Sequence, residues 1–79
     1  MTKYYAIQIG GEFIPAHERI ETFVNESDAR AFCKERNAAL AGGYKSREAY
    51  QNDANALEWS VFDHAKAERE HPDLLEDLF

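Results

Sequence analysis

The chain has 79 residues, a formal net charge of −6 at pH 7, 44% hydrophobic residues and a single cysteine. These values predict one soluble domain over residues 1–79 with a modest core. They exclude a disordered chain and an internal disulfide, so we expect a reducing, cytoplasmic environment. The negative charge argues against direct nucleic-acid binding, and no run of about 18 apolar residues predicts a membrane span.

The first expected element is a strand over residues 3–9, in which a buried face alternates with a more polar one. The buried set is Tyr5, Ile7 and Ile9. Gly10-Gly11 favours a tight hairpin, with a return strand over residues 12–14 that Pro15 interrupts. A second β segment is expected over residues 19–24, where apolar and polar side chains alternate again.

The main helix is expected near residues 26–41. Asn25 or Ser27 can cap its first amide groups, and acidic residues in its first turn suit the helix dipole. Apolar residues recur at helical spacing and place Cys33 on the buried face. Gly42-Gly43 then ends the helix.

The remaining elements are shorter. Ser46 can cap a helix over residues 47–51, and residues 57–62 alternate as a strand that completes an antiparallel sheet of about three strands. Pro72 stops a polar helix after residue 71 or begins another. The predicted fold class is therefore α+β, with the sheet packed against the main helix and short helical segments at the C-terminus.

Charge is distributed unevenly along the chain. Residues 1–47 contain six acidic and seven basic residues, a net charge of +1. Residues 48–79 contain nine acidic and two basic residues, a net charge of −7, and the two sums give the total of −6. The excess negative charge thus lies almost entirely in the C-terminal two-fifths of the chain, which holds the last predicted strand and the helical segments after it.

Candidates for catalysis and metal binding are few. Cys33 has no base beside it on the predicted apolar face, which indicates a core residue rather than a nucleophile. His64, Glu68 and His71 have a spacing that could present ligands to zinc on one continuous helix, but a solvated His–Glu pair is the favoured interpretation. We expect no catalytic residue, no metal site and no cofactor, and hence no enzyme.

The acidic C-terminal part favours a protein-binding function. Such a surface attracts a partner rich in Lys and Arg, such as a nucleic-acid-binding protein. The predicted partner-binding residues are Glu58, Asp63, Glu68, Glu70, Asp73, Glu76 and Asp77. The alternative is a non-enzymatic phage or bacterial accessory module that acts as a homodimer through its apolar C-terminal residues, which are Leu74, Leu75, Leu78 and Phe79. For the chain in general we expect a monomer or a weak homodimer.

The small size, the Gly10-Gly11 hairpin, the helix from Asn25 to Leu40, the acidic C-terminal half and the lack of a catalytic motif resemble small phage-encoded proteins. In particular, the chain looks like the anti-CRISPR inhibitors. The resemblance concerns size and charge over the whole chain, because those inhibitors share no common motif. It implies an inhibitor in the host cytoplasm whose acidic side chains occupy a basic nucleic-acid-binding groove of a Cas effector.

Overall fold

The computed structural model describes residues 3–10, 14–53 and 57–76. The elements, in chain order, are β1 (Tyr4–Ile9), the 3₁₀-helix η1 (Ala16–Glu18), β2 (Ile20–Phe23), α1 (Glu26–Ala41), α2 (Arg47–Asn52), β3 (Glu58–Asp63), α3 (His64–Glu70) and α4 (Pro72–Glu76). The chain forms the predicted α+β fold, with one antiparallel sheet, one main helix and short C-terminal helices. The fold is elongated, at 41 × 27 × 17 Å.

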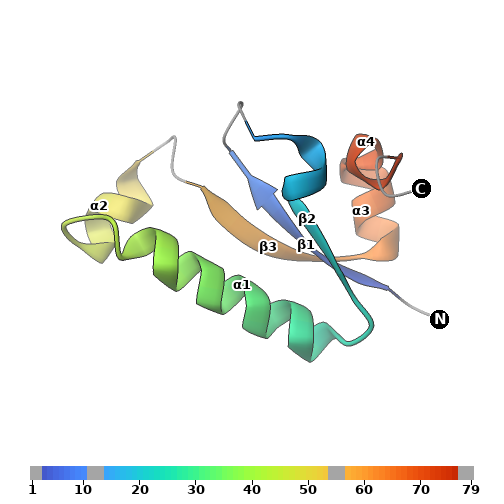
Figure 1. The fold of residues 1–79 in the computed structure, drawn as a ribbon, viewed down its shortest axis with the longest axis horizontal. Coiled ribbons are helices and arrows are strands. Elements are labelled where there is room, and N and C mark those ends of the chain that lie inside the picture. Colours follow the sequence, from blue (N-terminus) through green and yellow to red (C-terminus); the bar gives the residue numbers. More distant parts are fainter. Residues whose placement is uncertain (1–2, 11–13, 54–56, 77–79) are drawn as a thin grey trace.

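The first strand occupies the centre of the sheet, whose order is β2-β1-β3 (Figure 1). Both pairings are antiparallel, and Tyr4 stands opposite Phe23 of β2 and Asp63 of β3. Because side chains alternate along a strand, Tyr5 and Ile7 point to one face while Ala6 and Gln8 point to the other. The central strand therefore contributes to two separate packing layers.

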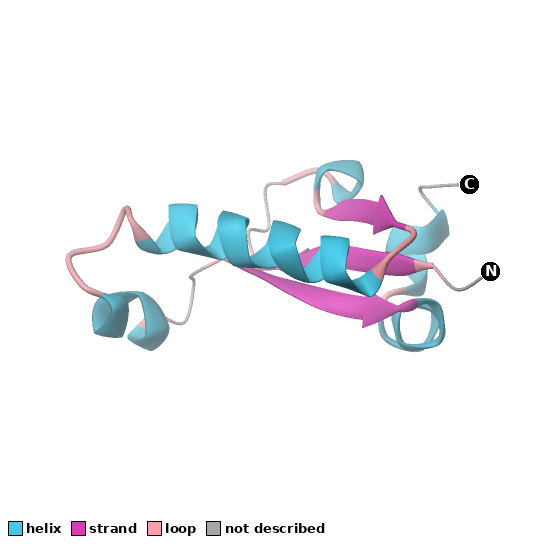
Figure 2. Cartoon of the chain, turned by 90° about the horizontal axis from the view of Figure 1, so that it is seen from below, coloured by secondary structure: helices cyan, strands magenta, loops and turns pink. Residues whose placement is uncertain are grey.

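The core consists of two clusters, one on each face of the sheet. On one face, β-strand residues meet α3 and α4: Tyr5, Ile7, Ile20 and Phe62 with Ala67 and Leu75. On the other face, which α1 crosses (Figure 2), the buried cluster consists of Ala6, Cys33 and Trp59. The prediction of a single buried face for β1 is therefore wrong, because helices cover both faces, whereas Ile9 remains 47% exposed.

The connection after β1 differs from the expected tight hairpin. Gly10 has a φ of 97°, which suits glycine, but the predicted return strand over residues 12–14 falls largely outside the described residues. Its last residue, Ile14, belongs to no strand. Pro15 and the following η1 turn the chain instead, and β1 pairs with the second expected β segment, β2.

Helix α1 confirms the main-helix prediction. It begins after the extended residue Asn25, whose side chain makes no capping hydrogen bond, and it ends at Ala41. Cys33 is buried, as predicted, and the Phe32 ring meets the Trp59 ring edge-on at a centroid distance of 5.1 Å. The absence of a large side chain at Ala6, which is fully buried, lets the helix approach the central strand.

Two side chains bond backbone groups at the beginning of β3. Asn37 of α1 accepts a hydrogen bond from the Trp59 N–H (2.7 Å) and donates one to the Trp59 carbonyl (3.0 Å). The Tyr50 hydroxyl of α2 donates to the Leu57 carbonyl at 2.5 Å. Helix α2 itself begins as predicted, because the Ser46 hydroxyl accepts a hydrogen bond from the Ala49 N–H. Side chains of α1 and α2 thus cover the beginning of this sheet edge.

Candidate protein-binding surface

The predicted partner-binding residues do not converge on one patch. Glu58 begins β3 on the side of α2, whereas Asp63 ends that strand where α3 begins. The other described members lie on α3 and α4, at the opposite end of the molecule from α2 (Figure 1): Glu68, Glu70, Asp73 and Glu76. These four residues define the α3–α4 acidic surface. Asp77 lies outside the described residues.

The two helices under this surface are short, and their ends are set by particular residues. Asp63 caps α3, because its Oδ1 accepts a hydrogen bond from the Lys66 N–H at 2.7 Å. The helix stops at His71, whose φ of −136° and ψ of 55° are not helical, and Pro72 then begins α4 at a position that needs no N–H donor. Asp63 therefore has a structural role in addition to its charge.

Burial of two apolar residues holds the surface against the sheet. Ala67 of α3 is fully buried and Leu75 of α4 is 6% exposed, both in the cluster around Tyr5. Leu74 packs against the same cluster. Two of the residues that the homodimer alternative requires thus contribute to the chain's own core, while Leu78 and Phe79 lie outside the described residues.

All four carboxylates of the α3–α4 acidic surface are exposed to solvent. Two basic residues share these helices, and the Lys66 ammonium lies 4.9 Å from the centre of the Phe62 ring. Glu68 lies 3.8 Å from the Nε2 atom of His64, and its side chain is 69% exposed. An exposed pair of this kind contributes only about 0–1 kcal/mol, so it does not prevent Glu68 from meeting a partner.

A polar contact joins this surface to the core. The hydroxyl of Tyr5, which is fully buried, lies 2.9 Å from the Nδ1 atom of His64 on α3. Burial raises the pKa of the Tyr5 hydroxyl, and the negative charge of Glu68 raises it further. Tyr5 therefore holds its proton in the folded state and fixes the first turn of α3 to the central strand.

Stability is expected to fall as the pH rises above about 10. Burial is the main cause that raises the pKa of both Tyr5 and Tyr50. The pKa of Tyr44 is raised mainly by its hydrogen bond to Asp53. Tyrosine in the unfolded chain ionises near pH 10, whereas the folded chain keeps these protons, so higher pH favours unfolding. Urea midpoints measured from about pH 8 to 11 test this prediction. The midpoint of a Tyr5→Phe variant should fall less steeply with pH than that of the parent chain. A parent midpoint that stays constant over this range would contradict the prediction.

The three residues with metal-like spacing do not form one ligand set. His64 and Glu68 lie on α3, but His71 follows the end of that helix and meets the Phe62 ring edge-on at 5.1 Å. His64 is also engaged through Nδ1 with Tyr5. Within residues 3–10, 14–53 and 57–76, no group of three or more His, Cys, Asp or Glu side chains is arranged to hold a metal ion.

Cys33 lies in an environment that does not activate a thiol. It is 6% exposed between α1 and the sheet, and burial raises its pKa. Since the thiolate is the nucleophilic form, the raised pKa lowers its reactivity at neutral pH. The structure thus supports the core role that the sequence predicts for this residue.

Comparison with protein-family models, with curated proteins and with solved structures finds no match for this chain. The described part of the chain contains no helix with the length and apolar character needed to cross a membrane. The functional argument therefore depends on the charges and contacts of the surface itself.

Sequence reasoning missed the Tyr5–His64 contact and the division of the acidic residues. The contact joins residues 59 positions apart, and no local pattern signals it. The division follows from strand geometry, because Glu58 and Asp63 stand at opposite ends of one strand. An excess of basic residues over positions 30–47 is a signal that could have pointed to a second charged region: Arg30, Lys34, Arg36, Lys45 and Arg47.

Proposed function

We propose that the protein is a non-enzymatic binding protein whose α3–α4 acidic surface docks on a basic surface of a partner protein. The observation that carries this proposal is that four exposed carboxylates lie on two helices that the core anchors through Ala67 and Leu75. Like charges placed together reduce the stability of the compact state, whereas they steer association with a basic surface and fix its orientation. A binding role accounts for that arrangement.

The natural complement is a groove that otherwise binds DNA or RNA, since such grooves are lined with Lys and Arg. Carboxylates on the protein would then take the positions of phosphates and exclude the nucleic acid. Inhibition of a Cas effector is the specific form of this proposal that the likeness to anti-CRISPR proteins supports. The protein would act in the cytoplasm of the host in that case.

Reversing all four charges of the surface tests the proposal: Glu68→Lys, Glu70→Lys, Asp73→Lys and Glu76→Lys. We expect binding to the partner to weaken by about a hundredfold or more, because attraction is replaced by repulsion. Binding of the parent chain should also weaken as salt is raised. The parent and variant serve as paired baits for affinity capture and mass spectrometry, and titration calorimetry at two salt concentrations then measures each affinity.

The matched control reverses four exposed carboxylates outside the surface: Glu18→Lys, Glu21→Lys, Glu35→Lys and Glu48→Lys. This variant has the same net charge as the test variant, so it separates the position of the charges from their sum. Binding that is insensitive to salt, or that falls equally in both variants, would overturn the proposal. Circular dichroism verifies that both variants are folded.

The Cas-specific form has its own test. Cells that carry an active CRISPR–Cas system reject a targeted plasmid, and expression of the chain should restore transformation if the chain blocks the effector. The test variant should fail to restore it, while the control variant should succeed. If rejection persists with every effector type assayed, the Cas-specific form is wrong, although another basic partner would remain consistent with the binding results.

A further inference from the structure

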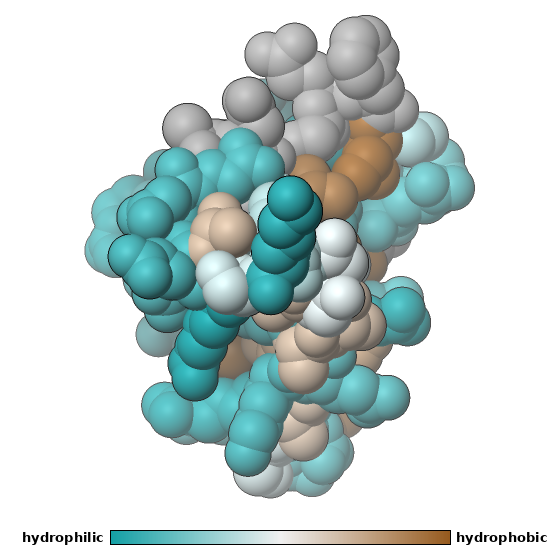
Figure 3. Space-filling model, turned by 90° about the vertical axis from the view of Figure 1, so that its left-hand side faces the viewer, coloured by the Kyte–Doolittle hydropathy of each residue, from teal (hydrophilic) through white to brown (hydrophobic). Residues whose placement is uncertain are grey.

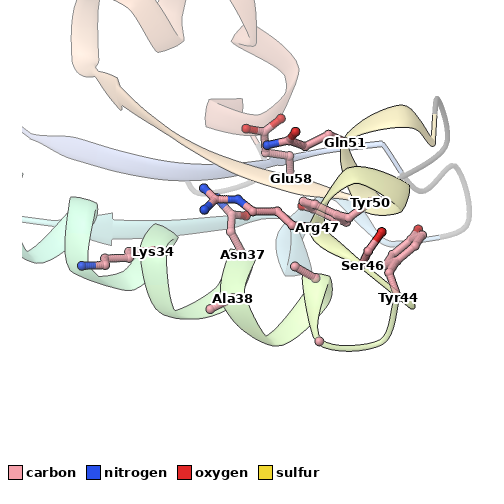
Figure 4. A pocket seen from close by; sticks show the side chains of 11 residues that line it. Lys34, Asn37, Ala38, Tyr44, Ser46, Arg47, Tyr50, Gln51 and Glu58 are labelled. Carbon is pink, nitrogen blue, oxygen red and sulfur yellow. The ribbon is translucent and has the colours of Figure 1, made fainter.

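A second surface lies at the end of the molecule opposite the acidic helices. It is a groove of about 650 Å³ between the C-terminal half of α1, the connection over residues 42–46, α2 and Glu58 of β3, which we name the α1–α2 groove (Figure 4). Its volume is within the range of about 300–1,000 Å³ that is typical of ligand sites. The end view of the molecule shows mainly hydrophilic side chains there, with apolar residues between them (Figure 3).

The walls of the groove are held in place by hydrogen bonds. The rings of Tyr44 and Tyr50 meet at a centroid distance of 5.2 Å, with planes inclined by 67°. Their hydroxyls donate to Asp53 (2.7 Å) and to the Leu57 carbonyl (2.5 Å). With both hydroxyls engaged, the rings offer fixed apolar surface, and small residues such as Ala38 on α1 leave the opposite side open.

Two cations, Lys34 and Arg47, line the groove. Lys34 and Arg47 are exposed, and among the described residues neither takes part in an ion pair, a hydrogen bond or a ring contact. Other cations of α1 are engaged, because Arg30 lies 2.6 Å from Glu26 and Arg36 lies over the Phe32 ring. In Figure 4, Arg47 extends from α2 toward Asn37 of α1. The groove thus presents positive charge in a chain that is negative overall.

We propose that the α1–α2 groove binds an acidic peptide segment of a partner protein. Its carboxylates would pair with Lys34 and Arg47, and its apolar side chains would contact the tyrosine rings. Glu58 and Gln51 at the rim can accept hydrogen bonds from peptide N–H groups. Recognition would use side chains rather than strand addition, because Asn37 and Tyr50 already occupy the β3 edge there.

A short acidic peptide fits the electrostatics better than a nucleic acid does. A polyanion brings a long row of phosphates toward a chain with a net charge of −6, and Glu58 lies at the groove itself. A peptide needs only two or three carboxylates near the two cations. This site is distinct from the α3–α4 acidic surface, so the protein could hold a basic and an acidic partner at the same time.

The first test uses a fluorescein-labelled octapeptide of alternating glutamate and alanine as the probe. We expect saturable binding in fluorescence anisotropy, and a loss of about tenfold or more in the double variant Lys34→Glu/Arg47→Glu. The matched control is Lys45→Glu/Arg69→Glu, which makes the same charge change at exposed residues that do not line the groove. An equal loss in both double variants would mean attraction by bulk charge and would overturn the proposal.

A second test leaves the charge unchanged. Ala38→Trp places a large side chain in the groove, whereas Ala31→Trp places one at an exposed position of α1 that does not line it. We expect the first variant to lose peptide binding about tenfold or more and the second to retain it. Equal melting temperatures would show that neither substitution unfolds the helix.

Three further results would overturn the proposal. These are no saturable binding of the acidic peptide, tighter binding of an oligothymidylate with the same dependence on Lys34 and Arg47, and concentration-dependent self-association in sedimentation that the double variant abolishes. The last two would assign the groove to a nucleic acid and to a second copy, respectively. The quadruple reversal on α3 and α4 should leave peptide binding intact, so failure of one proposal is distinguishable from failure of the other.

Discussion

Replacing Tyr5 with alanine is expected to lower the free energy of unfolding by about 3–5 kcal/mol, a large share of the stability of so small a protein. Tyr5 is fully buried in the central strand, opposite Thr22 of β2 and Phe62 of β3. Removing a buried aromatic side chain costs about 3–5 kcal/mol. A chain of this size has a free energy of unfolding of only roughly 0.05–0.15 kcal/mol per residue, so the loss is a large part of the total.

Denaturation in urea, followed by circular dichroism, measures this effect. Tyr5→Phe should cost about 1 kcal/mol, because it keeps the ring and removes only the hydrogen bond to His64. Tyr4→Ala is the positional control, since Tyr4 is only partly buried. A Tyr5→Ala variant that unfolds at the same urea concentration as Tyr4→Ala would show that the cluster around Tyr5 contributes less than its burial indicates.

Replacing Asn37 with alanine is expected to destabilise the protein by about 2–3 kcal/mol. The Asn37 amide bonds both backbone groups of Trp59, and its removal leaves an N–H and a carbonyl in a partly buried position without their partner. It also exposes the edge of β3, which becomes available for pairing with another chain. The variant should therefore aggregate more readily on heating.

Amide hydrogen exchange distinguishes this effect from a general loss of helix stability. The Trp59 amide should lose protection more than amides at the centre of β1 do. Asn52→Ala, at the exposed end of α2, is the control and should change stability by less than about 0.5 kcal/mol. If the Trp59 amide is equally protected in the parent chain and in Asn37→Ala, the Asn37 side chain does not protect the edge of β3.

Much of the fold could be predicted because its elements have strong local signals. Cys33 and its apolar neighbours recur at helical spacing, and the predicted helix near 26–41 coincides with α1. Ser46 precedes α2 as its cap. The strand predicted over residues 57–62 differs from β3 by one residue at each end.

The parts that could not be predicted depend on contacts between distant segments. Gln8 is buried because α1 covers the face of the sheet on which Gln8 and Ala6 lie. A glutamine in a strand does not by itself indicate burial. The role of Asn37 could not be predicted either, because its hydrogen-bond partner, Trp59, lies 22 positions away in the sequence. For the candidate surface, charge counts predicted an acidic half, but the placement of Glu58 away from the α3–α4 acidic surface follows from the direction of β3.

The central position of β1 also has a consequence for the order of events during synthesis. The ribosome synthesises β1 before β3, so one side of β1 has no partner until β3 emerges, and the Tyr5–His64 contact closes a loop of 59 positions. Closing such a loop is entropically slow compared with forming α1. The nascent chain therefore carries an incomplete sheet until residues 58–63 have left the exit tunnel, and α3 and α4, which follow β3 in the chain, take their places only after that.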